Sequence, residues 1–211
     1  MADLSLSRHF FERDPDAVAR DLVGSLIVMR ASGRSVRALI VETEAYGGSD
    51  DPASHAFRGT TPRCAVMFGP AGFLYVYRSY GLHWCMNVVT GPSGSASAVL
   101  LRAAQVLTAL KGSEPSDAHA ALSGPGNLTR GLGVTGSENA LECCGGSGGR
   151  VSFRGPLDDS ERERIGSSQR VGLSRGRDRL SRYFLEGHPA VSRPRVSPAR
   201  RNEDEETSRR R

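Results

Sequence analysis

The hydrophobic and polar positions of this chain form short apolar runs separated by turn signals, a pattern typical of many short strands. Runs with strand character occupy residues 26–30, 36–41, 73–78, 82–89, 98–103 and 151–153. Helix starts, in which a capping side chain precedes proline, are predicted at Asp14-Pro15 and Thr61-Pro62. A third short helix is predicted to open at Gly124-Pro125.

Two pairs of these strands are predicted to form hairpins. A turn at 31–34 joins the first pair, and Ser79-Tyr80-Gly81 forms a tight tip between the second pair. Side chains alternate along a strand, so each strand of the second hairpin presents a polar and aromatic face: Tyr75 and Tyr77 on one, and His83, Cys85 and Asn87 on its partner.

Together these elements predict an α+β fold. We expect a single mixed domain, residues 1–192, with a curved, mainly antiparallel β-sheet and surrounding short helices. From about Pro189 onward, Pro, Ser, Arg and Glu dominate and almost nothing can be buried. Residues 193–211 are therefore predicted to form a disordered tail rich in Arg and Glu.

Composition favours a cytoplasmic protein. The 211 residues contain no apolar run of 18 and no basic region followed by an apolar core at the N-terminus, so neither a membrane span nor a signal peptide is predicted. Four cysteines, at positions 64, 85, 143 and 144, show no Cys-x-x-Cys spacing and favour a reducing compartment.

The net charge of +5 is weak support for nucleic-acid binding by the folded body. Residues 189–211 carry seven Arg and four acids, or +3, which leaves +2 for the rest. An arginine-rich segment, with arginines at 162, 164, 170, 175 and 177, is predicted to be solvated surface.

The first candidate for chemistry is the stretch Glu42-Thr43-Glu44-Ala45-Tyr46. Here an apolar strand is followed by two carboxylates and then by a loop that Gly47 and Gly48 make flexible. Glu42 and Glu44 point the same way, so one of them could act as a general base beside a pocket. The alternative is two solvated carboxylates on an edge strand. Arg102, within another apolar run, is either an edge charge or an ion-pair partner for a site carboxylate.

Other candidate chemistries are weaker. His55 could be structural or part of a site, and a metal site from Cys64, Cys85, His55 and His83 lacks zinc-type spacing. Cys85 lies in mid-strand, where a thiol is usually inert. Aromatic residues beside an acid suit a flat, electron-poor ring. Tyr80, at the hairpin tip, could enter a base stack or fold over its own hairpin.

Several ordered motifs resemble the alkyladenine (3-methylpurine) DNA glycosylase family. They cover roughly residues 8 to 192 and include residues 42–46, 54–55, 61–63, 67–68, 75–81, 85–87, 100–103, 123–126 and 170–172. One departure is Cys64, where the family pattern usually has asparagine after Thr-Pro-Arg.

The resemblance implies a monofunctional enzyme that flips alkylated or deaminated purines out of double-stranded DNA and hydrolyses the N-glycosidic bond. It implies the following roles: Glu44 as general base, Arg102 behind the site helping to hold water and base, Tyr46, His55, Tyr77 and Asn87 in the base pocket, and Tyr80 as the intercalating wedge. Arg63 and Arg78 are expected on the DNA backbone. No cofactor or metal is expected, and a monomer near the nucleoid is the simplest state. A lyase step would need a lysine, and Lys111, the only one, is far from the motifs.

Two other readings stay open at this stage. A nucleic-acid binding module without catalysis would keep Tyr80 and the basic surface but would not need Glu44. A small-molecule hydrolase could use Glu42 and Glu44 as a carboxylate pair, since residues two apart on a strand lie about 7 Å apart at Cα.

Overall fold

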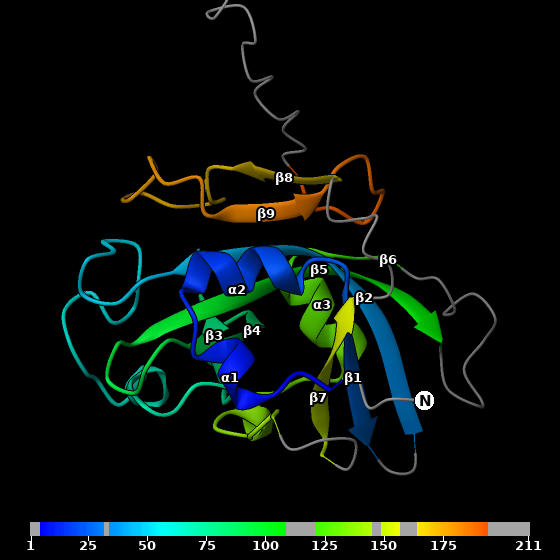
Figure 1. Ribbon diagram of the computed structural model, residues 1–211, viewed down its shortest axis with the longest axis horizontal. Helices are drawn as coiled ribbons and strands as arrows, with labels where there is room; N and C mark the ends of the chain where they lie inside the picture. Colours follow the sequence, from blue (N-terminus) through cyan, green and yellow to red (C-terminus); the bar gives the residue numbers. More distant parts are fainter. Residues whose placement is uncertain (1–4, 32–33, 109–120, 145–148, 157–163, 194–211) are drawn as a thin grey trace, which may run out of the picture.

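A computed structural model describes residues 5–31, 34–108, 121–144, 149–156 and 164–193 (Figure 1). The described helices are α1 (Arg8–Phe11), α2 (Pro15–Leu22), α3 (Pro125–Leu132) and the short 3-10 helices η1 (Ala65–Phe68) and η3 (Gly136–Glu138). The strands are β1 (Ser25–Ala31), β2 (Arg34–Tyr46), β3 (Leu74–Ser79), β4 (His83–Thr90), β5 (Ser97–Thr108), β6 (Ala121–Ser123), β7 (Val151–Pro156), β8 (Ile165–Ser168) and β9 (Arg182–Leu185).

All the strands belong to one antiparallel sheet, in which β2 is central. The main order is β3-β4-β5-β2-β1-β7, with β6 on β5, and with β9 linking β8 to β2. On one edge β2 pairs first with β1 and then with β9, while β5 follows its other edge. The predicted α+β, mainly antiparallel fold is confirmed.

Both predicted hairpins and the first predicted helix are present. The β1–β2 pair and the β3–β4 pair are antiparallel neighbours in the sheet. Helix α2 starts as predicted, because the Asp14 carboxylate accepts hydrogen bonds from the backbone N–H groups of Asp16 (2.9 Å) and Ala17 (3.2 Å). Helix α3 likewise starts with Pro125 at its first position.

The helix predicted to start at Thr61-Pro62 is wrong in position and type. The Cys64 N–H donates to the Thr61 carbonyl at 3.1 Å, and the Thr61 hydroxyl lies 3.1 Å from the Cys64 sulfur. Residues 61–64 therefore form a turn, and the 3-10 helix η1 begins only at Ala65. Arg63 consequently does not lie at the N-terminus of an α-helix.

Strand β2 also runs further than the pattern predicted. Glu42, Thr43 and Glu44 are strand residues paired with both β5 and β9, so Glu44 lies within the strand and not in the flexible glycine loop that follows it. The solvated edge-strand alternative is wrong, because the side chains of Glu42 and Glu44 are completely buried. Thr43 points to the opposite face, where its hydroxyl donates to the Ala19 carbonyl in α2 at 2.7 Å.

The C-terminal part of the chain holds two strands that the sequence pattern did not predict, β8 and β9. Figure 1 shows this hairpin lying across one side of the body. Its apolar residues pack with Val41, Ala103, Ala190 and Val191 in a small core. The prediction that burial stops at about Pro189 is wrong, since Ala190, Val191 and Ser192 are buried.

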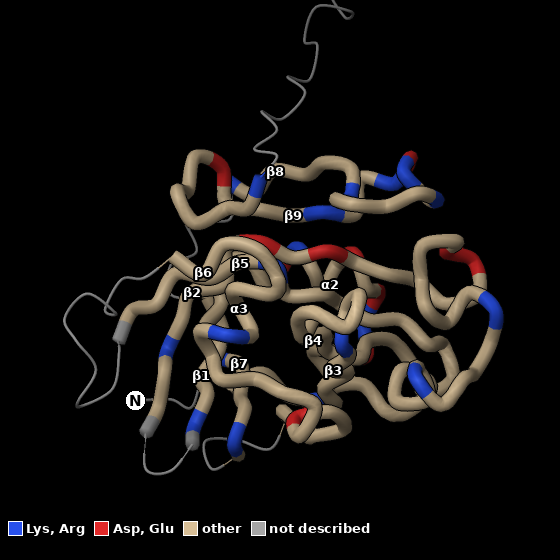
Figure 2. The backbone as a smooth tube through the Cα atoms, turned by 180° about the vertical axis from the view of Figure 1, so that it is seen from behind, with Lys and Arg blue, Asp and Glu red and all other residues tan. Residues whose placement is uncertain are grey.

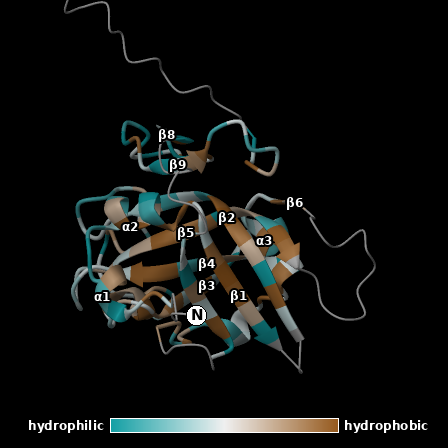
Figure 3. Cartoon of the chain, turned by 45° about the vertical axis from the view of Figure 1, so that its right-hand side comes forward, coloured by the Kyte–Doolittle hydropathy of each residue, from teal (hydrophilic) through white to brown (hydrophobic). Residues whose placement is uncertain are grey.

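The main core lies between the sheet and helices α1, α2 and α3. Figure 3 shows that apolar residues concentrate on the strands, whereas polar residues colour many of the surrounding turns. Within the described residues, no helix is long and apolar enough to cross a membrane. The predictions for Lys111, Arg162 and the tail from 194 fall outside the described residues.

Candidate active site

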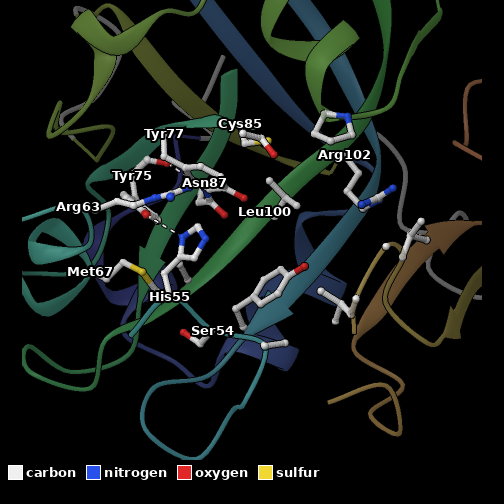
Figure 4. A pocket seen from close by; sticks show the side chains of 18 of the residues that line it. Ser54, His55, Arg63, Met67, Tyr75, Tyr77, Cys85, Asn87, Leu100 and Arg102 are labelled. Atoms are coloured by element: carbon white, nitrogen blue, oxygen red, sulfur yellow. Dashed lines mark hydrogen bonds between the residues drawn. The ribbon is translucent and has the colours of Figure 1, made fainter. Parts of the chain in front are cut away.

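A cavity of about 500 Å³ opens between the β3–β4 hairpin, β5, the turn at 53–55 and the segment 171–173. This volume is within the range of about 300–1,000 Å³ that small-molecule sites occupy. The predicted site residues that line it are Tyr46, His55, Arg63, Tyr77, Tyr80, Asn87 and Arg102. Figure 4 shows His55, Tyr77 and Asn87 on one side and Arg102 on the other. Neither Glu44 nor Arg78 lines it; Glu44 is fully buried behind three residues that do, Tyr46, Arg102 and Val171.

Aromatic rings form one wall of this cavity. The ring of His55 lies edge-on to Tyr77, with centroids 4.6 Å apart and planes at 78°. Tyr75 and Tyr77 are 5.3 Å apart and tilted by 30°. The guanidinium of Arg63 lies 5.0 Å from the Tyr77 ring centroid. Such a wall offers π faces and edges to a flat ring.

The hydrogen bonds around His55 favour one tautomer. Its Nδ1 lies 2.9 Å from the Tyr75 hydroxyl, and Arg63 also hydrogen-bonds to Tyr75. Burial raises the pKa of Tyr75 to about 12, so the hydroxyl keeps its proton. Since Arg63 can only donate, that proton goes to Nδ1 of His55. Partial desolvation at the cavity wall and the nearby Arg63 charge lower the pKa of His55, which favours a neutral ring protonated at Nε2.

Glu44 is the carboxylate beside this cavity, and three groups hold it. The Tyr46 hydroxyl donates to Oε2 at 2.8 Å, and the Val171 backbone N–H donates to Oε1 at 2.7 Å. The Arg102 Nη1 lies 3.3 Å from Oε2. Burial and the neighbouring carboxylate raise the pKa of Tyr46 well above its usual value, so Tyr46 stays a donor. A carboxylate has about four acceptor positions, so these three contacts leave one position of Glu44 unoccupied.

Arg102 is an ion-pair partner, not an edge charge. Its Nε donates to Oε1 of Glu42 at 2.7 Å, while Nη1 reaches Glu44. Its side chain is 8% exposed, so both pairs are screened little by solvent. Of the two predicted settings for Arg102, an edge charge or an ion-pair partner of a site carboxylate, the second is the one found.

Asn87 has a fixed orientation. Its Nδ2 donates to the Tyr75 carbonyl at 2.9 Å across the β3–β4 pair. The residue is buried on the cavity side of β4, next to Leu100 on β5. A fixed amide at this position narrows the cavity and gives it a polar wall.

Tyr80 lies at the tip of the β3–β4 hairpin and is 89% exposed, so the alternative in which it folds inward is wrong. Its φ of 48° is in the left-handed region, which the tight tip requires. Arg78, one of the two arginines predicted to contact DNA, alternates away from Tyr77 and lies 5.8 Å from the Trp84 ring.

The sequence pattern did not identify Asp51 as part of the site, and it wrongly predicted that Arg170 lies on the solvated surface. Arg170 is not solvated: its guanidinium is buried, bonds both oxygens of Asp51, and donates to the Ala45 carbonyl at 2.9 Å. It also lies 4.7 Å from the Tyr46 ring centroid. Arg170 thereby holds Tyr46 and brings the Val171 N–H to Glu44. The only early signal was the Arg170-Val171-Gly172 motif, which carried no assigned role.

The cysteines and histidines considered as metal ligands do not come together. In the part of the chain that the structure describes, no group of three or more His, Cys, Asp or Glu side chains could hold a metal ion. Cys64 and Cys85 are buried and free.

The fold and this cavity suit a hydrolase that acts on a flat aromatic ring. Residues 9–189 match the family model described as methylpurine-DNA glycosylase (MPG). A protein of Rhodopseudomonas palustris (strain BisB18) is 44% identical over 195 residues, covering 90% of this chain and 91% of its own. One from Frankia casuarinae is 45% identical over 204 residues, covering 91% and 93%.

A protein of Mycobacterium tuberculosis (strain H37Ra) is 44% identical over 200 residues, covering 89% of this chain and 94% of its own. All three relatives carry the name "Putative 3-methyladenine DNA glycosylase". The chain belongs to the methylpurine-DNA glycosylase family, which is a family of DNA repair glycosylases acting on alkylated purines. The resemblance seen in the sequence motifs is confirmed.

Proposed function

We propose that this protein flips alkylated or deaminated purines of the 3-methyladenine class out of double-stranded DNA and hydrolyses their N-glycosidic bond, leaving an abasic site. The observation that carries the proposal is a buried carboxylate, Glu44, beside an aromatic cavity of about 500 Å³ whose mouth has an exposed tyrosine, Tyr80. Neither alternative reading accounts for both features. A binding module does not need Glu44, and a small-molecule hydrolase does not need Tyr80.

Glu44 is the general base in this mechanism. Alkylation at N3 or N7 makes a purine cationic, so it is already a good leaving group. Glu44 accepts a proton from water and stabilises the developing positive charge on the sugar. General-base help of this kind contributes roughly 10²–10⁴-fold. Arg102 and the Val171 N–H hold the carboxylate in place.

The aromatic wall selects the base. Tyr46 and Tyr77 stack on the flipped ring, which is favourable for a cationic purine. The Nε2–H of neutral His55 donates to an acceptor on the base, and Asn87 disfavours the 2-amino group of guanine. Tyr80 fills the gap in the duplex, and flipping costs a few kcal/mol, less for a damaged and poorly stacked base.

Arg63 and Arg78 contact the DNA backbone in this proposal. Both are exposed and belong to segments next to the cavity mouth or the hairpin tip. Figure 2 shows further basic positions on the turns around the body. We expect a monomer without cofactor or metal, acting in the cytoplasm near the nucleoid. We also expect no lyase step.

The test is single-turnover release of 3-methyladenine and hypoxanthine from duplex DNA, with and without chelator. Wild-type protein should release base in both conditions. Glu44→Gln keeps the shape and the acceptor oxygen but cannot take a proton, so release should fall at least about 100-fold with duplex binding retained. Turnover by Glu44→Gln at the wild-type rate would remove Glu44 from its role. Tight binding of damaged duplex without release by wild type would instead favour the binding module.

A further inference from the structure

Behind Glu44 lies a second buried carboxylate that the proposed chemistry does not use. Glu42 is fully buried, although isolated carboxylates are almost never found in a protein interior. It is held by two arginines: Nε of Arg102 and Nε of Arg182 each donate to Oε1 at 2.7 Å. Arg182 is itself completely buried, in β9.

The remaining contacts of Glu42 come from a residue 150 positions away. The backbone N–H of Ser192 donates to Oε2 at 2.7 Å, and its hydroxyl donates to Oε1 at 2.9 Å. The same hydroxyl accepts from Nη2 of Arg102 at 3.1 Å, while the Ser192 carbonyl accepts from Nη2 of Arg182 at 3.0 Å. Ser192 therefore touches all three charged groups.

We infer that Glu42, Arg182 and Ser192 are positioning residues, which orient Arg102 toward Glu44 and keep the charge around the general base balanced. This inference rests on the proposed role of Glu44. It also gives the segment 186–192 a function: this segment must pack against β2 before Ser192 can contact Glu42 and complete the site.

Orientation follows from the geometry of the guanidinium. Nε of Arg102 donates to Glu42 and Nη2 donates to Ser192. Nη1 is the remaining nitrogen, and it lies 3.3 Å from Oε2 of Glu44. A guanidinium is planar and rigid, so fixing two of its nitrogens fixes the third. Without Glu42 or Ser192, Arg102 could rotate away from Glu44 or into the cavity.

Charge balance follows from the count of ions. Two carboxylates, Glu42 and Glu44, share this interior with Arg102 and Arg182, and the four charges sum to zero. Removal of Arg182 would leave an excess negative charge in a desolvated site and would take a partner from both Glu42 and Ser192, so these two residues would hold Arg102 less firmly. Arg182 therefore acts on Arg102 through Glu42 and Ser192, without touching the substrate.

The docking of Ser192 is supported by apolar packing. Two turns after β9 bring it back: the His188 N–H donates to the Leu185 carbonyl, and the Val191 N–H to the His188 carbonyl, both at 3.2 Å. Ala190 and Val191 are buried against Val41 and Phe184. The segment therefore has its own reason to fold onto β2, and Ser192 arrives at Glu42 as a consequence.

The experiment compares single-turnover excision with lesion-duplex affinity and thermal melting. Glu42→Gln has the same shape as Glu42 but lacks the charge, and we expect the excision rate to fall about 10–100-fold while duplex affinity changes little. Ser192→Ala, a milder change without loss of charge, should lower the rate several-fold. Should Glu42→Gln not fold, Ser192→Ala decides.

Two controls separate positioning from simple stability. Glu138→Gln alters another buried carboxylate, which pairs with Arg150 at 2.6 Å and does not line the cavity. It should lower the melting temperature but leave the excision rate of folded protein unchanged. If Glu42 acts through Arg102, the double variant Glu42→Gln/Arg102→Gln loses no more rate than Arg102→Gln alone.

A chain that ends at Arg193 should retain full excision, whereas one that ends at His188 should lose rate as Glu42→Gln does. A wild-type rate in folded Glu42→Gln or Ser192→Ala overturns the inference while leaving the proposed function in place. Absence of release by wild type would instead show that the proposed function has failed.

Discussion

At the scale of single residues, the site depends on polar side chains whose partners are already in place. Glu44, Tyr46 and Arg102 are buried or nearly so, and each has a hydrogen bond or ion pair that fixes its orientation. A preorganised site of this kind needs little rearrangement when charge develops on the substrate. His55 differs in being exposed, although its Nδ1, 2.9 Å from the Tyr75 hydroxyl, also has a partner in place.

His55 makes stability depend on pH. Partial desolvation and the Arg63 charge lower its pKa below the ordinary value of 6.5, so the unfolded chain binds this proton more readily. The free energy of unfolding therefore decreases as the pH falls below about 6.5, because protonation of His55 favours the unfolded chain. Below the pKa of His55 in the folded protein, this effect no longer changes with pH. We expect His55→Gln to lose less melting temperature than wild type between pH 7.5 and pH 5.5. An equal loss in both proteins would show that His55 is not the group responsible.

At the scale of elements, the β3–β4 hairpin combines a cavity wall with an exposed tip. Register places Tyr75 opposite Asn87 and Tyr77 opposite Cys85, so alternate side chains of both strands line the cavity. The sequence was sufficient to predict this, because a hairpin with a tight turn leaves little freedom of register. It was insufficient for β8 and β9, which are short and gain their stability from pairing with β2.

The tip of this hairpin provides a direct test of base flipping. Tyr80→Ala removes a side chain that is 89% exposed, so folding should be little affected. Stacking on a base contributes about 1–3 kcal/mol, so damaged-duplex affinity should fall roughly 5–150-fold. Leu82→Ala, at a site 79% exposed on the same tip, is the matched control and should have a smaller effect. Unchanged affinity in Tyr80→Ala would argue against a wedge.

At the scale of the whole molecule, segments far apart in the chain converge on β2. Helix α2 covers one face of β2 through Thr43, and the segment after β9 reaches Glu42 on the other face. The sheet thus serves as a platform on which distant segments meet. Charge at the far C-terminus is a separate matter.

Residues 194–211 carry six Arg and four acids, a net charge of +2. We expect their deletion to leave the melting temperature unchanged and to reduce only non-specific, salt-sensitive DNA affinity, with a shallower dependence of log K on log salt. Titrations with undamaged duplex at several salt concentrations provide the measurement. A lower melting temperature for the shortened chain would show instead that these residues contribute to folding.

The sequence by itself determined the local elements: the Asp14 cap, the two hairpins, the position of Tyr80 at a tip and the shared face of Glu42 and Glu44. These depend on contacts between residues close in the chain, which periodicity and turn chemistry describe. The order of its motifs also indicated the family.

Only the tertiary structure decided which charges are buried. From the sequence, Glu42 and Glu44 could equally be solvated, and it is the pairing of β2 with β5 and β9 that buries them. Arg170 was predicted to lie on the surface, and its ion pair with Asp51 allows it to be buried. The reason is physical: the cost of burying a charge is offset only by partners brought from far along the chain, here 119 residues away for Asp51 and Arg170 and 150 for Glu42 and Ser192. The pattern of neighbouring residues in the sequence cannot predict those partners.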